Sequence, residues 1–271
     1  MRLAPADRRL HKNSCMATAP RILIALATYN ERDNLAPLVA EIRATVPAAD
    51  LLILDDNSPD GTGAVADEAA AKDARIHVIH RPGKQGLGTA ILTVMRYAMD
   101  HDYDLLVTMD ADFSHHPRYL PDLLKGMDQA DVMIGSRYVP GGGVENWPWS
   151  RRMMSRWTGR LVRFLLGIPA RDTSGNYRCY RVSLLRRANL DGFLSAGYSF
   201  QQEALHRCYL AGARLGETPI IFADRKAGKS KANLREMARS VFTLFRLGWR
   251  ARFRKASMMP AESGGSPPRV G

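Results

Sequence analysis

Long apolar runs and paired cysteines are both missing from this chain of 271 residues. Apolar runs such as Ile22–Ala27 fall far short of the ~18 residues that a membrane-spanning helix needs. The three cysteines, Cys15, Cys179 and Cys208, lie far apart without CxxC spacing. The sequence therefore predicts neither a zinc site nor a disulfide framework, and a reducing, cytoplasmic setting is expected. Residues 1–20 lack the continuous apolar core of a secretory signal.

The overall composition is that of a globular protein, with 45% hydrophobic and 24% charged residues. These fractions exclude collagen-like and wholly disordered classes. The length is sufficient for one large α/β domain or two small ones with a real core.

The net charge of +12 is concentrated at the two ends of the chain. Residues 1–21 hold five Lys/Arg against one Asp, and residues 225–255 hold eleven against one Glu. Residues 22–224, by contrast, hold 22 Lys/Arg and 24 Asp/Glu. Such basic ends favour nucleic acid or an anionic membrane surface as a partner, or else they are solvated tails.

Strands and helices are expected to alternate over the first 140 residues. Because such alternation builds right-handed βαβ units, the fold class is α/β, with a mostly parallel sheet flanked by helices. The predicted strands are Arg21–Thr28, Leu51–Leu54, Ile76–His80 and Asp104–Met109, and the predicted helices are Asn34–Val46, Thr62–Lys72 and Gly86–Asp100.

Polar clusters follow three of these strands, at Thr28–Glu31, Asp55–Asp60 and Asp110–Ser114. Ligands collect outside the carboxyl ends of strands in parallel sheets. A binding site is therefore predicted at this edge.

The second half of the chain reads as a completion of the same domain. Val139–Trp149 is too irregular for regular structure, Ser150–Leu166 is a basic amphipathic stretch, and residues 171–224 return to short strands and helices. The predicted layout is an N-terminal extension (1–20), one domain (21–232), a basic amphipathic C-terminal helix (233–255) and a disordered tail (256–271).

Asp110-Ala111-Asp112 is the sharpest local signal. In extended backbone, residues two apart face the same side, so both carboxylates can converge on one divalent cation. Mg²⁺ or Mn²⁺ prefers such oxygens and completes its shell with water and substrate phosphates. A solvated acidic loop is the alternative.

Two further loops have ambiguous signals. Asp55-Asp56-Asn57-Ser58 can accept hydrogen bonds from a ribose or a base, but these residue types also cap turns. Gly83–Gly88 lacks the P-loop pattern and is predicted to be a tight loop that opens a helix.

Basic side chains supply candidate phosphate contacts, because guanidinium binds phosphate oxygens in a bidentate fork. The Gly and Ser of the loop 225–231 would let it close over a pyrophosphate. The candidates are Arg137, Arg151, Arg152, Arg225, Lys229 and Lys231.

Two basic segments have helical amphipathic spacing, Ser150–Leu166 and Asn233–Phe253. A basic helix with Trp and Phe on its apolar side is typical of the membrane interface, where each basic residue contributes about 1 kcal/mol. Packing of the apolar side against the domain is the alternative.

Taken together, the motifs resemble dolichol-phosphate (polyprenyl-phosphate) mannosyltransferases, a branch of the family 2 glycosyltransferases with the GT-A (Rossmann-like) fold. The resemblance spans about residues 21–250, with the motifs in order. Its motifs are Thr28-Tyr29-Asn30-Glu31, Asp55–Thr62, Gly86-Leu87-Gly88, Asp110–Pro117 and Gly135-Ser136-Arg137-Tyr138.

The resemblance implies a donor site for a nucleotide sugar. It assigns Asp110 and Asp112 to the metal. It also places Arg137 near the reaction centre. The implied catalytic residues are therefore Asp110, Asp112 and Arg137. It implies that the guanosine pocket is lined by Ala27 (where the family often has Pro), Tyr29, Glu31, Leu54 and Asp56, and that the diphosphate meets Asp110, Ala111, Asp112, Arg137, Arg225 and Lys231.

For the acceptor, the resemblance implies that Arg151 and Ser155, in the family's RxxxS spacing, bind a phosphate together with Arg137. Some members have a third metal ligand, Gln, where this chain has Ser114. The implied partners are GDP-mannose, a polyprenyl or dolichyl phosphate and the anionic cytoplasmic face of a membrane; a membrane-anchoring subunit stays open.

The implied reaction is a single inverting displacement. An acceptor phosphate is already anionic near neutral pH, so no general base is required. A UDP-sugar donor is the alternative within the fold. A nucleic-acid-binding protein is the alternative outside it, but the net acidic body and the absence of an RNP-type motif argue against nucleic acid.

Overall fold

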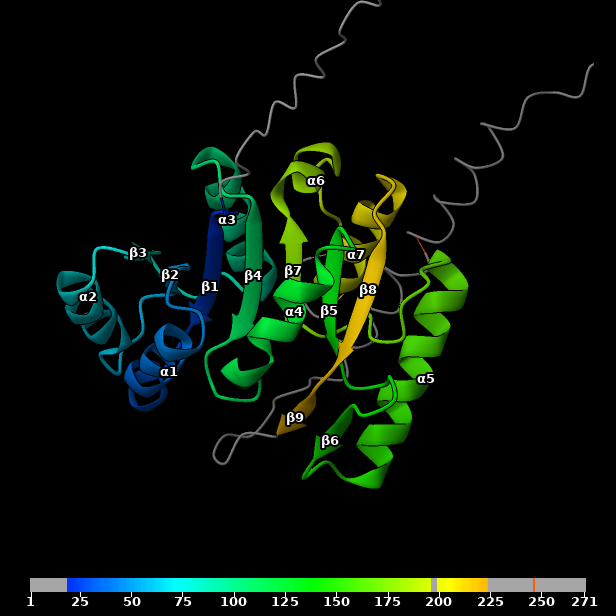
Figure 1. Ribbon diagram of the computed structural model, residues 1–271. Helices are drawn as coiled ribbons and strands as arrows, with labels where there is room; N and C mark the ends of the chain where they lie inside the picture. The colour runs from blue at the N-terminus through cyan, green and yellow to red at the C-terminus, as the bar shows by residue number, and fades with distance from the viewer. Residues whose placement is uncertain (1–18, 196–198, 224–245, 247–271) are drawn as a thin grey trace, which may run out of the picture.

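The computed structural model describes residues 19–195, 199–223 and 246, which form a three-layer α/β domain (Figure 1). Seven strands make the main sheet in the order β3-β2-β1-β4-β7-β5-β8, and β6 pairs with β9 in a small second sheet. The strands are β1 (Ile22–Thr28), β2 (Asp50–Asp55), β3 (Ile76–His80), β4 (Leu105–Asp110), β5 (Val132–Ser136), β6 (Gly143–Glu145), β7 (Arg178–Arg181), β8 (Leu215–Pro219) and β9 (Ile221–Ala223).

Helices cover both faces of this sheet and bury two apolar cores against it. Apolar side chains of α1 and α4 pack on one face, and those of α3, α6 and α7 pack on the other. The helices are α1 (Arg32–Thr45), α2 (Thr62–Lys72), α3 (Leu87–Asp100), the short 3₁₀ helix η1 (Pro117–Tyr119), α4 (Leu120–Gly126), α5 (Trp149–Leu166), α6 (Val182–Arg187) and α7 (Phe200–Leu210). No helix in the described ranges is long and apolar enough to cross a bilayer.

The predicted α/β class and its alternation of strands and helices are confirmed. The first four strands pair in parallel as expected. The loop at Gly83–Gly88 leads into α3, and Gly86 precedes the helix with a φ of 93°, a conformation that glycine adopts without strain. The segment Ser150–Leu166 is the helix α5, which begins one residue earlier.

Two features differ from the sequence expectation. Strand β7 runs antiparallel between β4 and β5, so the sheet is mixed at its centre. Residues 139–149, expected to be irregular, contain β6, which pairs with β9. Three-residue strands with distant partners show no periodicity, so local sequence cannot reveal them. The C-terminal helix, the tail and residues 1–18 lie outside the described residues.

Candidate functional site

The three polar clusters meet at the carboxyl edge of the central strands. Ala27, near the end of β1, stands in register with Leu54 on β2 and with Asp110 on β4. The edge therefore gathers residues that lie far apart in the sequence, as expected from the parallel pairing.

Asp110 ends β4 with its carboxylate partly exposed and oriented by a neutral donor. Asn176 Nδ2 donates to Asp110 Oδ1 at 2.9 Å. Asp112 follows in the loop, where the backbone N–H and the hydroxyl of Ser114 donate to its Oδ1 at 3.1 and 2.5 Å. Ser114 thus orients the carboxylate of Asp112.

These two carboxylates fit a divalent cation whose remaining ligands come from water and substrate. The described residues contain no group of three or more His, Cys, Asp or Glu side chains placed to enclose a metal ion. Oxygen ligands with open coordination positions suit Mg²⁺ or Mn²⁺ bound together with a diphosphate.

His115 lies beneath this loop and has no metal-ligand spacing in the sequence. Its Nδ1 accepts a hydrogen bond from the backbone N–H of Asp110 at 3.0 Å, and its ring stacks on Tyr177 with centroids 5.0 Å apart. Burial lowers the pKa of His115, and this effect outweighs the neighbouring carboxylates, Asp110 and Asp112. His115 is therefore a neutral support for the Asp110 backbone.

A second support, which sequence reasoning missed, runs from α7 to Asp110. Gln201 Nε2 donates to Asn176 Oδ1 at 2.6 Å, and Asn176 in turn donates to Asp110. The backbone carbonyl of Asn176 accepts from the Thr108 hydroxyl at 2.7 Å. Because Asn176 is anchored on both sides, the orientation of the Asp110 carboxylate is fixed before any ligand arrives.

The part of the site predicted to bind the nucleotide contains an exposed aromatic ring and a buried ion pair. Tyr29 is 37% exposed, and Lys84 Nζ lies 4.3 Å from its ring centroid. Asp56 is buried, and Arg81 binds its Oδ1 at 2.5 Å while donating to the Thr89 hydroxyl at 2.8 Å. Arg81 belongs to no motif in the sequence, and Lys84 lies in the Gly83–Gly88 loop, for which no binding role was predicted.

Other residues of the predicted pocket lie at the same edge in different environments. Glu31 accepts from Asn34 Nδ2 at 2.8 Å and precedes α1. Leu54 is fully buried, and Ala111 is nearly so. Asp55 accepts from the Ser58 backbone at 2.9 Å, which is the turn-capping role left open by the sequence.

Arg137 is buried and forms a bidentate pair with Asp172. Its Nε and Nη2 donate to the two carboxylate oxygens at 2.7 and 2.8 Å, and Nη2 also reaches the Ser174 hydroxyl at 2.8 Å. Burial alone would lower the pKa of Arg137, but Asp172 raises it above its ordinary value. The guanidinium is thus a fixed cation, and sequence reasoning did not find its partner.

The predicted acceptor residues lie around Trp147, next to Arg137. The guanidinium carbons of Arg151 and Arg137 lie 4.0 and 5.6 Å from the Trp147 ring centroid. Ser155 on α5 is 2.5 Å from the hydroxyl of Tyr138. Arg137, Arg151 and Ser155 therefore share one region, whereas Arg225 and Lys231 lie outside the described residues.

The buried ion pair of Arg137 and Asp172 predicts that the stability of the protein depends on pH. Burial raises the pKa of Asp172, but Arg137 more than offsets this and holds it below its ordinary value. The contribution to stability is therefore present above the unfolded-state pKa of about 3.9 and is lost as pH falls through the lower folded-state pKa. The difference in unfolding free energy between wild type and Asp172→Asn, measured by urea titration, is expected to shrink below about pH 4. A constant difference would contradict this assignment.

Comparison with protein families gives a match that covers most of these residues. The model of "Glycosyl transferase family 2" matches residues 23–188, which include the whole Asp110–Asp112 loop, Arg137 and α5. The chain belongs to glycosyl transferase family 2. The matched residues fall within the predicted domain 21–232.

Two curated relatives resemble the chain over most of its length. An undecaprenyl-phosphate mannosyltransferase from Micrococcus luteus is 44% identical over 234 residues, covering 86% of this chain and 96% of the relative. A polyprenol monophosphomannose synthase from Mycolicibacterium smegmatis is 42% identical over 238 residues, covering 87% and 90%.

Solved structures place the fold among GT-A glycosyltransferases. Glucosyl-3-phosphoglycerate synthase from Mycobacterium tuberculosis, in complex with Mn²⁺, UDP-glucose and phosphoglyceric acid, has a TM-score of 0.61 and 17% identity, covering 85% of this chain and 80% of that chain. A mannosyltransferase from Pyrobaculum calidifontis in complex with GDP-Man and Mn²⁺ has a TM-score of 0.57 and 16% identity, covering 93% and 67%.

Proposed function

We propose that this protein transfers mannose from GDP-mannose to a polyprenyl or dolichyl monophosphate, giving polyprenyl-phosphate β-mannose. The observation that carries the proposal is the match, at over 40% identity and along nearly their full lengths, to two relatives named for polyprenyl-phosphate mannose synthesis. The site supports it, because two oriented carboxylates and a fixed arginine lie near one edge of the sheet.

Asp110 and Asp112 would hold Mg²⁺ or Mn²⁺ in this proposal. A divalent cation bound there supplies positive charge that stabilises the leaving diphosphate. Asn176, Ser114 and His115 hold the two carboxylates and the adjoining backbone in place. The other proposed donor contacts are Ala27, Tyr29, Glu31, Leu54, Asp56, Ala111, Arg137, Arg225 and Lys231.

Arg137, Arg151 and Ser155 would bind the acceptor phosphate. One phosphate oxygen attacks C1 of mannose as the bond from C1 to the GDP oxygen breaks, so the configuration at C1 inverts. The attacking oxygen carries its own negative charge and gives up no proton, so alignment and charge neutralisation supply the catalysis.

The Asn176 contact predicts an effect on metal affinity. Asn176→Ala removes the hydrogen bond that orients Asp110, so the Mn²⁺ concentration for half-maximal activity is expected to rise about 10–100-fold. Activity at saturating Mn²⁺ is expected to fall much less. Metal titration of the transfer reaction, with Mn²⁺ binding measured separately by calorimetry, checks both statements. An unchanged Mn²⁺ affinity would contradict the role of Asn176.

We further propose that the enzyme works as a peripheral protein on the anionic cytoplasmic face of a membrane. The acceptor's apolar polyprenyl chain partitions into the bilayer of a cell membrane, and α5 exposes both arginines and large apolar side chains. Retention on anionic liposomes exceeding that on RNA at matched salt is expected, and the reverse result would favour nucleic-acid binding.

The deciding experiment is a panel of donors and acceptors with the purified protein and Mg²⁺ or Mn²⁺. Mannosyl lipid is expected from GDP-mannose with polyprenyl phosphate in detergent, and mass analysis identifies the product. No product from any polyprenyl phosphate would refute the proposal. Product from UDP-glucose in place of GDP-mannose would establish the UDP-sugar alternative.

A further inference from the structure

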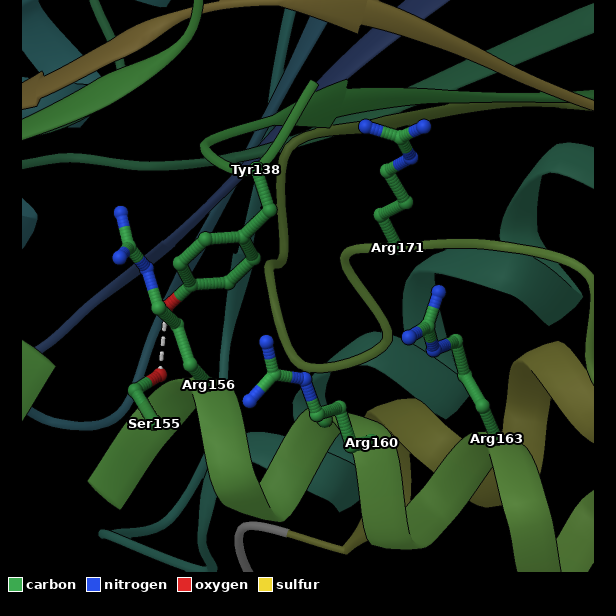
Figure 2. Close-up of a pocket in the computed structure, with 7 residues that line it drawn as sticks. Tyr138, Ser155, Arg156, Arg160, Arg163 and Arg171 are labelled. Atoms are coloured by element: carbon green, nitrogen blue, oxygen red, sulfur yellow. Dashed lines mark hydrogen bonds between the residues drawn. The ribbon is translucent and has the colours of Figure 1, made fainter. Parts of the chain in front are cut away.

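A cavity of about 380 Å³ opens along α5 (Figure 2), and neither Asp110 nor Asp112 lines it. The side chains of Arg156, Arg160 and Arg163 extend from α5 toward the side where Tyr138 and Arg171 lie. The full lining is Tyr138, Ser155, Arg156, Gly159, Arg160, Arg163 and Arg171.

Four arginines around one cavity form a strongly cationic site. Within residues 19–195 and 199–223, no carboxylate lies within ion-pair distance of these four guanidinium groups. The guanidinium of Arg160 instead lies 5.7 Å from the Trp157 ring centroid. Arginine forks match phosphate oxygens, so the chemistry of the lining selects a phosphate-bearing anion.

This cavity extends beyond the proposed acceptor phosphate site. Arg137 and Arg151 do not line it, and only Ser155 belongs to both. At about 1.5 Å per helical residue, Arg160 and Arg163 lie about 7.5 and 12 Å further along the α5 axis than Ser155. A phosphate bound by Arg137, Arg151 and Ser155 would therefore leave Arg160 and Arg163 to a second anionic group.

A row of exposed apolar side chains runs beside the arginines. Trp157 and Phe164 are 61% and 74% exposed. At about 100° per residue, all of this row except Trp149 occupies the helical arc adjoining Arg156, Arg160 and Arg163, and Trp149 falls among the arginines. Large aromatic side chains next to arginines are typical of the membrane interface. The exposed row comprises Trp149, Met154, Trp157, Leu161 and Phe164.

We propose that the arginine cavity of α5 binds the phosphate head of an anionic phospholipid while Trp157 and Phe164 insert into the same leaflet. The inference rests on the proposed membrane attachment and goes further, because it assigns a defined site and one class of lipid. Since Ser155 and Tyr138 line the cavity, the bound leaflet surface would lie next to the acceptor residues.

The test is vesicle binding by the full chain, with phosphatidylcholine vesicles that contain or lack phosphatidylglycerol. Arg160→Gln with Arg163→Gln is expected to lower the partition coefficient on phosphatidylglycerol vesicles about 30-fold, as about 1 kcal/mol per arginine implies. Trp157→Ser with Phe164→Ser, at exposed positions, is expected to weaken binding to both kinds of vesicle.

Lys72→Gln with Arg187→Gln is the matched control. It removes the same charge from exposed positions on α2 and α6, so a loss below about twofold is expected. Wild-type binding by the α5 arginine variant, or an equal loss in the control, would overturn the inference. Competition by inorganic phosphate alone at equal concentration would assign the cavity to a free anion and also overturn it.

Mannosyl transfer by the wild-type enzyme in detergent separates the two proposals. Absence of transfer there refutes the proposed function. Transfer in detergent together with unselective vesicle binding refutes only the lipid site.

Discussion

Replacing Asp172 by asparagine is expected to lower the free energy of unfolding by about 3–5 kcal/mol, because the buried Arg137 is left without its counter-charge. Asparagine keeps the size of the side chain, so loss of packing does not account for the effect. Urea titration at neutral pH measures it. Transfer activity is expected to fall as well, since the guanidinium loses the bidentate contact that fixes its orientation.

Asp191→Asn is the control for this prediction. Asp191 also pairs with an arginine, Arg96, but both side chains are largely exposed, at 87% and 53%. Exposed ion pairs contribute up to about 1 kcal/mol. Similar losses in the two variants would contradict the prediction that Asp172→Asn leaves Arg137 as an uncompensated buried charge.

Asp112→Ala is expected to lower the rate of mannosyl transfer at least about 100-fold, the second large effect. Asp112 is one of the two proposed metal ligands, and loss of a residue that only supports a ligand already costs 10–100-fold. Initial rates with GDP-mannose and polyprenyl phosphate, at several Mn²⁺ concentrations, measure the loss. Thermal unfolding is expected to change little, since the side chain lies in a surface loop.

Asp122→Asn is the matched control for Asp112. It removes one carboxylate from the exposed first turn of α4 and is expected to keep the wild-type rate. Removing the divalent ion with EDTA is expected to abolish transfer by wild type, and Mn²⁺ is expected to restore it. Wild-type rates in Asp112→Ala would contradict the metal assignment.

Periodicity and turn chemistry were sufficient to predict the parallel half of the fold. Continuous apolar runs predicted β1 to β4. The strand direction also places Asp110, at the end of β4, and the loop that follows it at the predicted edge of the sheet, while their role as metal ligands stays a prediction. The antiparallel strand β7 was not predictable. It lies between β4 and β5 because of long-range pairing that local sequence does not encode.

The supporting residues of the site could not be predicted from the sequence for the same physical reason. Asp172 pairs with Arg137, which lies 35 positions earlier in the chain, and Asn176 binds Asp110, which lies 66 positions earlier. Neither residue belongs to a recognisable motif, and both lie in the segment that leads into β7, whose place in the sheet depends on long-range pairing. Residue-level predictions for the donor and acceptor contacts otherwise stay predictions.

The loop just before β7 would couple the binding of the two proposed substrates. In this loop, Asp172 accepts hydrogen bonds from the guanidinium of Arg137, which is proposed to bind the acceptor phosphate. Asn176 donates to the carboxylate of Asp110, which is proposed to hold the metal on the donor side. The five consecutive residues 172–176 thus connect the two halves of the proposed site, so a displacement of this segment would disturb both contacts at once. Binding of the donor would then change the position of the acceptor residues, and a saturating donor concentration would alter the apparent affinity for the lipid acceptor.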